Sequence, residues 1–260
     1  MSDNCSKGVA VVTGATGAIG RAITLKLASE GYVVCVHYCT QTDSAKQIIK
    51  KIRHKGGEAF AVGADISKLN EVKNLFDKAA SNNPTLSILI NNASISKDAP
   101  IGTLTEQKLC QTVDIDLLGT YRCIAQAAKF MIRSGRGVIV NIGSLSAEMP
   151  RYGQVAYAMA KSGLVGLTRA AALELARFGI RVNLVAPGPV IGGMSNKFIR
   201  LKREELIKKI PLGGFPTPDD IGDCVAWLCS DNAAWITGQT ISIDAGLSLT
   251  NSMTSVLKRI

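Results

Sequence analysis

Short runs of β-branched and other apolar residues alternate with longer helical patterns along most of the 260-residue sequence. Near-continuous apolar runs are typical of strands that are covered on both faces, as in a parallel sheet. We expect six strands, at 8–13, 32–38, 58–63, 86–90, 137–142 and 180–186. We expect helices at 19–29, 43–55, 69–80, 112–133 and 155–178. Strands that alternate with helices form right-handed βαβ units, so the sequence predicts an α/β protein with a doubly wound parallel sheet.

The sequence shows no internal boundary. No Pro- or Ser-rich linker, repeat or break in composition divides residues 1–260, so we expect a single domain. The segment 192–214 differs from its surroundings, because glycines flank a short basic helical pattern that ends before Pro211. Glycine hinges around a small helix are typical of a lid that closes over a substrate. A surface excursion without that role is the alternative.

Composition argues against membrane and disordered classes of protein. With 47% hydrophobic and 19% charged residues, the chain is expected to be compact. No apolar run reaches the ~20 residues that span a bilayer, and the first residues lack the pattern of a signal peptide. We therefore expect a cytoplasmic protein with no membrane partner.

Metal and nucleic-acid binding are not favoured either. The seven cysteines form no CxxC pair and there are two histidines, so no metal site is expected. The formal charge of +10 has its densest sources at 46–55 and 197–209, where isoleucines or glutamates stand among the basic residues and no motif of interleaved aromatics occurs. A solvated basic surface is therefore expected rather than a nucleic-acid site. Such a surface favours anionic cofactors or an acidic carrier protein by electrostatic steering.

The first expected strand runs into a glycine-rich turn that is followed at once by a helix. Small residues there let the backbone lie close to a pyrophosphate, whose charge the helix N-terminus favours. Tight strand-to-helix turns also need glycine, but the position after the first strand of a βαβ unit indicates dinucleotide binding in a Rossmann-like fold. The candidate phosphate-binding residues are Gly14, Thr16, Gly17, Ala18, Ile19 and Gly20.

The end of the second strand bears on the choice of cofactor. An acidic residue there binds the ribose 2′-hydroxyl of NAD, whereas neutral or basic residues accommodate the 2′-phosphate of NADP. Tyr38 and Cys39 occupy that end, and Asp43 lies too far along the chain. NADP(H) is therefore favoured. NAD(H) is the alternative, because the glycine turn holds Gly17 where an arginine would favour a phosphate.

Tyr157 and Lys161 stand four residues apart on a helical pattern, so they share one face. A phenol has an ordinary pKa of about 10, and a neighbouring ammonium group favours its ionised form, which suits acid–base catalysis near neutral pH. Ser144 follows the strand expected at 137–142, at the edge where parallel strands open onto a site. Its hydroxyl can hydrogen-bond a substrate oxygen. Taken alone, each of these residues is common on ordinary protein surfaces.

Together these motifs resemble the short-chain dehydrogenase/reductase family, in order and spacing, from Val9 to about Gly246. The turn at 13–20 resembles the family's TGxxx[AG]xG sequence. The segment 235–246 resembles the closing strand, which in this family usually helps to build a tetramer. The resemblance assigns further cofactor contacts to Asp65 and Ile66 at the adenine, to Asn92 and Ala93 of the NNA motif, and to Pro187, Gly188 and Val190 near the nicotinamide.

The resemblance also implies a mechanism and shows three departures from the family pattern. It implies that NADPH passes hydride to a carbonyl carbon while Tyr157 protonates the oxygen, Lys161 assists the tyrosine and binds the nicotinamide ribose, and Ser144 positions the substrate oxygen. The family's fourth catalytic member, a helix asparagine, aligns with Asp116. Ser94 replaces the glycine that ends the NNAG motif, and Gly192 replaces a threonine after the PG turn. None of these departures removes a reacting group.

Within the family, the chain most resembles 3-oxoacyl-[acyl-carrier-protein] reductases of fatty acid biosynthesis, through its length and the dipeptide at 153–154. That resemblance implies an acidic acyl carrier protein as partner, and the family's closing strand implies a homotetramer. The arginines that lie where this subgroup's docking arginines would fall are Arg133, Arg136, Arg169 and Arg177, with ordinary exposed arginines as the alternative. An NAD(P)-dependent dehydrogenase of a small alcohol, sugar or polyol is the alternative enzyme. A non-catalytic dinucleotide-binding regulator is the alternative of another class, against which the intact Ser144, Tyr157 and Lys161 argue.

Overall fold

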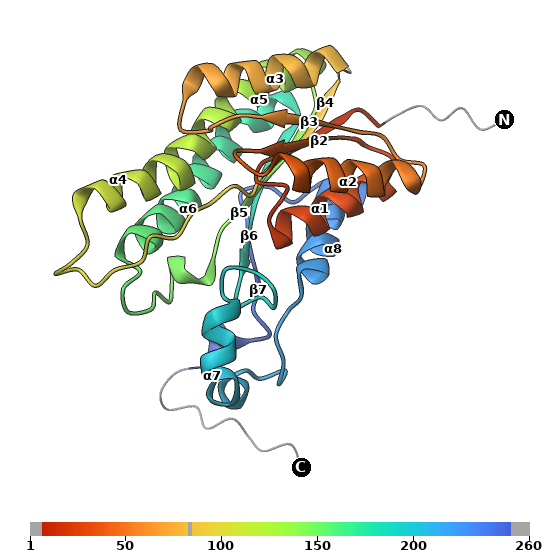
Figure 1. Cartoon of the computed structure of the whole chain (residues 1–260). Helices are drawn as coiled ribbons and strands as arrows, with labels where there is room; N and C mark the ends of the chain where they lie inside the picture. The colour runs from red at the N-terminus through yellow and green to blue at the C-terminus, as the bar shows by residue number, and fades with distance from the viewer. Residues whose placement is uncertain (1–6, 83–84, 251–260) are drawn as a thin grey trace.

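The computed structural model describes residues 7–82 and 85–250, and its core is one sheet of parallel strands (Figure 1). The strand order is β3-β2-β1-β4-β5-β6-β7, and every strand pairs in parallel with its neighbours. The strands are β1 Val9–Val12, β2 Val33–Tyr38, β3 Ala59–Gly63, β4 Leu86–Asn91, β5 Gly137–Ile142, β6 Ile180–Pro187 and β7 Thr240–Ile243. The predicted doubly wound α/β sheet is confirmed, and each of the six strands expected from periodicity is present within two residues of its predicted bounds.

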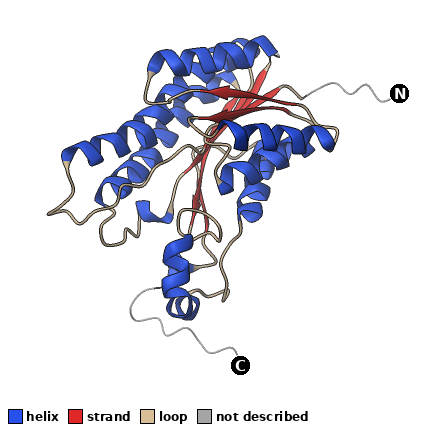
Figure 2. Cartoon of the chain, in the orientation of Figure 1, coloured by secondary structure: helices blue, strands red, loops and turns tan. Residues whose placement is uncertain are grey.

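Helices cover both faces of this sheet (Figure 2). They are α1 Ala18–Ser29, α2 Thr42–His54, α3 Leu69–Asn82, α4 Glu106–Val113, α5 Thr120–Ser134, α6 Val155–Leu175, α7 Asn196–Lys209 and α8 Pro218–Cys229. Helices α1, α2 and α8 pack in one hydrophobic core, and α3, α5 and α6 pack in the other. Figure 1 shows α4 beside α6, and α7 beyond the ends of β6 and β7, away from both layers.

The central strand β1 explains why the apolar runs in the sequence are nearly continuous. Ala10 and Val12 lie in the core beneath α1, α2 and α8, whereas Val9 and Val11 lie in the core beneath α3, α5 and α6. All four side chains are fully buried. Because successive strand residues point to opposite faces, a strand that is covered on both sides needs an apolar residue at every position.

The helix expected at 112–133 is divided in the structure. α4 ends at Val113, a π-helical turn spans Asp114–Gly119, and α5 begins at Thr120. The turn lies against the loop after β3, because a Cβ atom on Gly119 would lie 2.9 Å from the Ile66 side chain. Such turns are rare and often mark functional sites. Here the turn carries Asp116.

The expected lid segment contains a helix between glycines. α7 is kinked at Lys202, and Gly192 and Gly213 adopt positive φ angles of +78° and +70°. Within the described residues, no helix combines the length and apolar character needed to cross a membrane. In the tail at 247–260, a 3₁₀ turn forms at Leu247–Leu249, and residues 251–260 lie outside the described residues, as do residues 1–6.

Candidate active site

The glycine-rich turn leaves the carboxyl end of β1, where the strand order reverses between β1 and β4. Ligands of doubly wound folds bind at such a switch point. Gly14 has a positive φ of +60°, and a Cβ atom on it would lie 2.7 Å from the Ala93 Cα. A Cβ atom on Gly20 would lie 2.3 Å from the Gly14 carbonyl oxygen. Both positions therefore require glycine. Gly14 is needed because its φ is positive and the Ala93 backbone lies close to it, and Gly20 is needed because the Gly14 carbonyl oxygen lies close to it.

The turn and the start of α1 form one side of a cavity of about 400 Å³. Gly17 precedes α1, no side chain caps the first amides of the helix, and its first turn holds no acidic residue. These amides and the helix dipole suit a pyrophosphate. Of the predicted cofactor residues, this cavity is lined by Gly14, Thr16, Gly17, Ala18, Ile19, Gly20, Cys39, Asp65, Ile66, Asn92 and Ala93. Tyr38 lines neither this cavity nor its neighbour described below, since its ring packs against the core.

Asn92 and Thr13 brace the glycine-rich turn. The Asn92 side-chain amide donates to the carbonyl oxygens of Thr13 and Gly14, at 3.0 and 2.9 Å. The Thr13 hydroxyl oxygen accepts from the backbone N–H groups of Asn92 and Ala93, at 2.9 and 3.1 Å. Asn92 thus lines the cavity and also fixes the shape of its wall. Thr13 was not among the predicted site residues.

His37 is a second residue that the sequence did not single out. The Gly14 N–H donates to His37 Nδ1 at 3.1 Å, and His37 Nε2 lies 2.9 Å from the Ala64 carbonyl oxygen. Both hydrogen bonds form together when the neutral ring carries its proton on Nε2. Burial lowers the pKa of His37, which favours this neutral form. The sequence signal that could have revealed this role is the presence of one histidine in the otherwise apolar strand β2.

The far end of the same cavity bears on the choice of nucleotide. Cys39, Thr40 and Gln41 line it after β2, and among the described residues that line this cavity there is no lysine or arginine. Asp65 lies after β3, where partial burial would raise its pKa, but hydrogen bonds from the Ser67 hydroxyl and N–H outweigh burial and lower it. Cys39, Thr40 and Gln41, which follow β2, are neutral, so this position offers no carboxylate to a ribose hydroxyl.

A second cavity, of about 430 Å³, brings together the three residues predicted to react. Ser144 follows β5, whereas Tyr157 and Lys161 lie on α6, with Lys161 Nζ 5.4 Å from the centroid of the Tyr157 ring. The Ser144 hydroxyl oxygen accepts from the Ser146 N–H at 3.1 Å, which leaves its proton available for a ligand. The predicted nicotinamide contacts Pro187, Gly188 and Val190 line this cavity too.

The two cavities adjoin. Five residues line both of them: Ile19, Asn92, Ser94, Gly193 and Met194. The second cavity also has an apolar part, to which Leu145, Met149, Phe198 and Leu206 contribute. α7 supplies two of these side chains, Phe198 and Leu206. An elongated ligand in the first cavity would therefore reach Tyr157 and Ser144, with room beside them for an apolar chain.

Asp116 lies behind Lys161 and lines neither cavity. Its carboxylate Oδ2 is 3.4 Å from Lys161 Nζ, and both side chains are almost fully buried. Lys161 Nζ also donates to the Ile142 carbonyl oxygen at 3.1 Å. The structure thus joins the four predicted catalytic residues in one place, with Asp116 in contact with the lysine rather than with the cavity.

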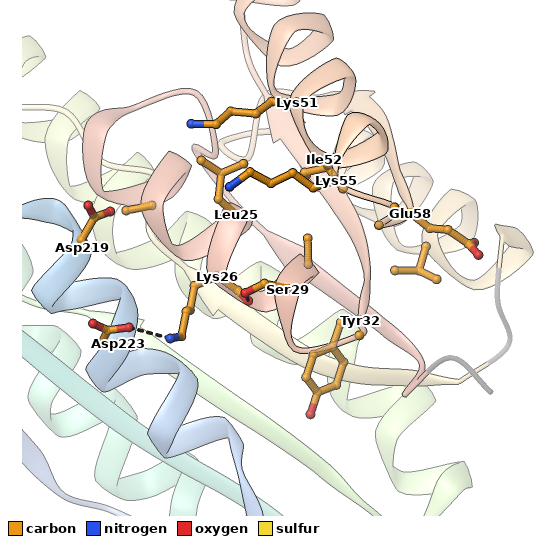
Figure 3. Close-up of a pocket in the computed structure, with 16 residues that line it drawn as sticks. Leu25, Lys26, Ser29, Tyr32, Lys51, Ile52, Lys55, Glu58, Asp219 and Asp223 are labelled. Carbon is orange, nitrogen blue, oxygen red and sulfur yellow. Dashed lines mark hydrogen bonds and ion pairs between the residues drawn. The ribbon is translucent and has the colours of Figure 1, made fainter. Parts of the chain in front are cut away.

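A further cavity, of about 680 Å³, lies by the amino ends of β2 and β3, where Val33 and Glu58 line it (Figure 3). Figure 3 shows charged side chains from α1, α2 and α8 around it, with Lys26 paired to Asp223 at 2.8 Å. None of the predicted reacting residues lines it. Nor do residues 7–82 and 85–250 contain a cluster of three or more His, Cys, Asp or Glu side chains placed to hold a metal ion.

Comparison with known proteins agrees with this geometry. Residues 14–248 match the family model described as enoyl-(acyl carrier protein) reductase. The chain is 40% identical to the 3-oxoacyl-[acyl-carrier-protein] reductase FabG of Staphylococcus epidermidis, over 92% of this chain and 98% of the relative. It is 35% identical to the 3-oxoacyl-[acyl-carrier-protein] reductase of Synechocystis, over 92% and 96%. A solved dehydrogenase/reductase from Sinorhizobium meliloti 1021 is 30% identical, with a TM-score of 0.86 over 93% of this chain and 95% of that one.

Proposed function

Since the chain belongs to the short-chain dehydrogenase/reductase family of nicotinamide-dependent oxidoreductases, we propose that it reduces the 3-oxo group of an acyl thioester with NADPH. One observation carries the proposal: Ser144, Tyr157 and Lys161 line a partly apolar cavity that shares a wall with the predicted nucleotide cavity. The names of relatives at 35–40% identity support the choice of substrate.

The proposed roles follow from the position of each side chain. When bound, the nicotinamide supplies a hydride to the carbonyl carbon. Ser144 donates a hydrogen bond to the substrate oxygen, since its own oxygen is already bonded to the Ser146 N–H. Tyr157 donates the proton that the reduced oxygen needs, and general acid catalysis of this kind contributes about 10²–10⁴-fold to the rate. Lys161 holds positive charge beside the phenol and bonds the ribose hydroxyls.

The preference for NADPH rests on the neutral position after β2. Cys39, Thr40 and Gln41 offer no carboxylate to a ribose 2′-hydroxyl, and the chain carries a formal charge of +10. An acidic side chain at this position would favour NAD(H). We expect kcat/KM to be higher with NADPH than with NADH, and Cys39→Asp to shift the ratio toward NADH. A wild-type preference for NADH would overturn this part of the proposal.

The proposed partner is an acidic acyl carrier protein, and the proposed assembly is a homotetramer. Arg133, Arg136, Arg169 and Arg177 are all exposed and offer positive charge to such a carrier. Light scattering on the purified protein measures the assembly. Competition by carrier protein in the reductase assay, weakened by salt, measures the docking.

The experiment that tests the function is NADPH oxidation with acetoacetyl-CoA, compared between wild type and Tyr157→Phe. We expect turnover by wild type and a loss of kcat of about 10²–10⁴-fold in the variant. Tyr152→Phe is the matched control, since that ring is 90% exposed and lines neither cavity. Turnover of small alcohols, sugars or polyols alone would replace the proposed substrate. Tight NADPH binding without turnover of any carbonyl would favour a regulator instead.

A further inference from the structure

Two departures from the family motifs meet in the structure. Ser94 replaces the last glycine of the NNAG motif after β4, and Asp116 replaces the helix asparagine in the π-helical turn. Although 22 residues separate them, the Ser94 hydroxyl donates a hydrogen bond to Asp116 Oδ2. A glycine at position 94 would have no side chain with which to make this bond. The two unusual residues therefore form one contact.

The Asp116 carboxylate is held by donors on both oxygens. Oδ1 accepts from the Ile95 N–H at 2.9 Å, while Oδ2 accepts from Ser94 and lies 3.4 Å from Lys161 Nζ. The side chain is fully buried, where an ionised carboxylate is costly unless it is paired and hydrogen-bonded. The Thr120 hydroxyl also donates to the Asp116 carbonyl oxygen, at 2.9 Å. Side chain and backbone of Asp116 are thus both fixed.

The position of Lys161 depends on this carboxylate. Lys161 is 2% exposed, and its ammonium group contacts Asp116 Oδ2 and the Ile142 carbonyl oxygen. Lys161 and Tyr157 both line the second cavity, with Lys161 Nζ 5.4 Å from the centroid of the Tyr157 ring. A shift of the carboxylate would move the ammonium group relative to the phenol, and misplacement of about 1 Å costs on the order of 100-fold in rate.

We propose that Ser94 is a positioning residue of the reaction, which acts with Asp116 as one unit to hold the Lys161 ammonium group beside Tyr157. This inference rests on the proposed function. Ser94 acts through Asp116, so its effect depends on the carboxylate. With an amide at position 116, one of the two carboxylate oxygens becomes an N–H group that cannot accept a bond from Ser94 or Lys161.

The test is a double-mutant cycle in the acetoacetyl-CoA assay with Ser94→Ala, Asp116→Asn and the combined variant. We expect Ser94→Ala to lower kcat on the order of 10-fold, as for a lost hydrogen bond to a charged group, with KM values within about twofold of wild type. In the Asp116→Asn background we expect Ser94→Ala to lower kcat by less than about twofold. Ser94→Thr keeps the hydroxyl and is expected to recover most of kcat.

Ser162→Ala is the matched control, because Ser162 is next to Lys161 but bonds the Ala147 carbonyl oxygen at 2.8 Å and lines neither cavity. We expect it to keep wild-type kcat. Wild-type kcat in Ser94→Ala, or an equal loss in both backgrounds, would overturn the inference and leave the proposed function standing. If wild type reduces another carbonyl but no acyl thioester, the proposed substrate fails, and the same cycle on that carbonyl decides the role of Ser94. If no carbonyl is reduced, both fail.

Discussion

Lys161 and Asp116 form an ion pair in the interior, with Nζ 3.4 Å from Oδ2 and side-chain exposures of 3% and 0%. Removing one partner of a buried pair leaves an uncompensated charge, which costs more than the pair contributes when intact. An exposed pair behaves differently, because water solvates each partner when the other is removed. Lys26 and Asp223 form one of the exposed pairs of the same chain, at 2.8 Å and with side-chain exposures of 39% and 65%.

The first prediction compares these two pairs. We expect Lys161→Met to lower the free energy of unfolding by about 3–5 kcal/mol, because the Asp116 carboxylate loses its counter-charge. Lys26→Met breaks the shorter pair but is expected to lower the free energy of unfolding much less, because water solvates the Asp223 carboxylate. Urea unfolding followed by circular dichroism measures both. If the two variants lost similar free energies of unfolding, burial of the ion pair would not determine the effect of removing its lysine.

The second prediction concerns His37 and pH. Burial lowers the pKa of folded His37 below its ordinary value of 6.5, so the unfolded chain binds the proton more readily. The contribution of neutral His37 to stability is therefore fully present above about pH 6.5 and is lost as pH falls below it, with a slope of at most about 1.4 kcal/mol per pH unit. Unfolding free energies measured across this range should show less acid loss in His37→Asn than in wild type.

His54 supplies the control for that measurement. It is the chain's other histidine and is exposed at the end of α2. We expect His54→Asn to keep the wild-type dependence of stability on pH. An unchanged acid loss in His37→Asn would assign the pH dependence to other groups.

The third prediction tests the position of the nucleotide through thiol chemistry. Cys39 is exposed and lines the predicted nucleotide cavity, although burial and the nearby Asp65 raise its pKa and slow its reaction with alkylating agents. We expect saturating NADPH to slow alkylation of Cys39, as measured by peptide mass spectrometry. Cys110 on α4 is also exposed but lines neither cavity, so its labelling should not change. Equal labelling of Cys39 with and without NADPH would place the nucleotide elsewhere.

The fourth prediction concerns the proposed lid. The Arg151 guanidinium Cζ lies 4.1 Å from the centroid of the Phe198 ring, and this contact joins the loop before α6 to α7. Phe198→Ala removes a cation–π contact of about 0.5–2 kcal/mol and part of the apolar wall. We expect KM for acetoacetyl-CoA to rise by about 2–30-fold, as that energy implies, with KM for NADPH less affected. Leu201→Ala, at a 73% exposed position on the same helix, should change neither constant.

The sequence was most informative where one local pattern decides the structure. Buried parallel strands require continuous apolar runs, so the six strands predicted from periodicity were found, and the glycine turn was recognised from its place after the first of them. Helix α8 was not predicted, although Thr217, Pro218 and Asp220 form a helix start that sequence can reveal. Its buried residues Ile221, Val225, Leu228 and Cys229 also follow helical spacing, so periodicity offered a second signal that was missed.

Contacts between distant segments were not predictable from the sequence. Ser94 and Asp116 were each noted as departures, but no periodicity relates a loop after β4 to a turn before α5. The π-helical turn adds to the difficulty, because it shifts the side chains that follow relative to an α-helical pattern. The role of His37 was not predicted for a similar reason, since its partners Gly14 and Ala64 follow two other strands, β1 and β3.

The cytoplasmic location and the homotetramer stay predictions.

The alternation of β1 between two cores also limits where the chain can change in length. Deleting one residue within Val9–Val12 would exchange the cores that the remaining side chains enter. It would also displace Gly14 relative to Ala93. The Ala93 backbone lies so close to Gly14 that a residue with a side chain could not replace this glycine. Insertions and deletions should therefore be excluded between β1 and α1. Packing therefore constrains the spacing of residues in this part of the chain as well as their types.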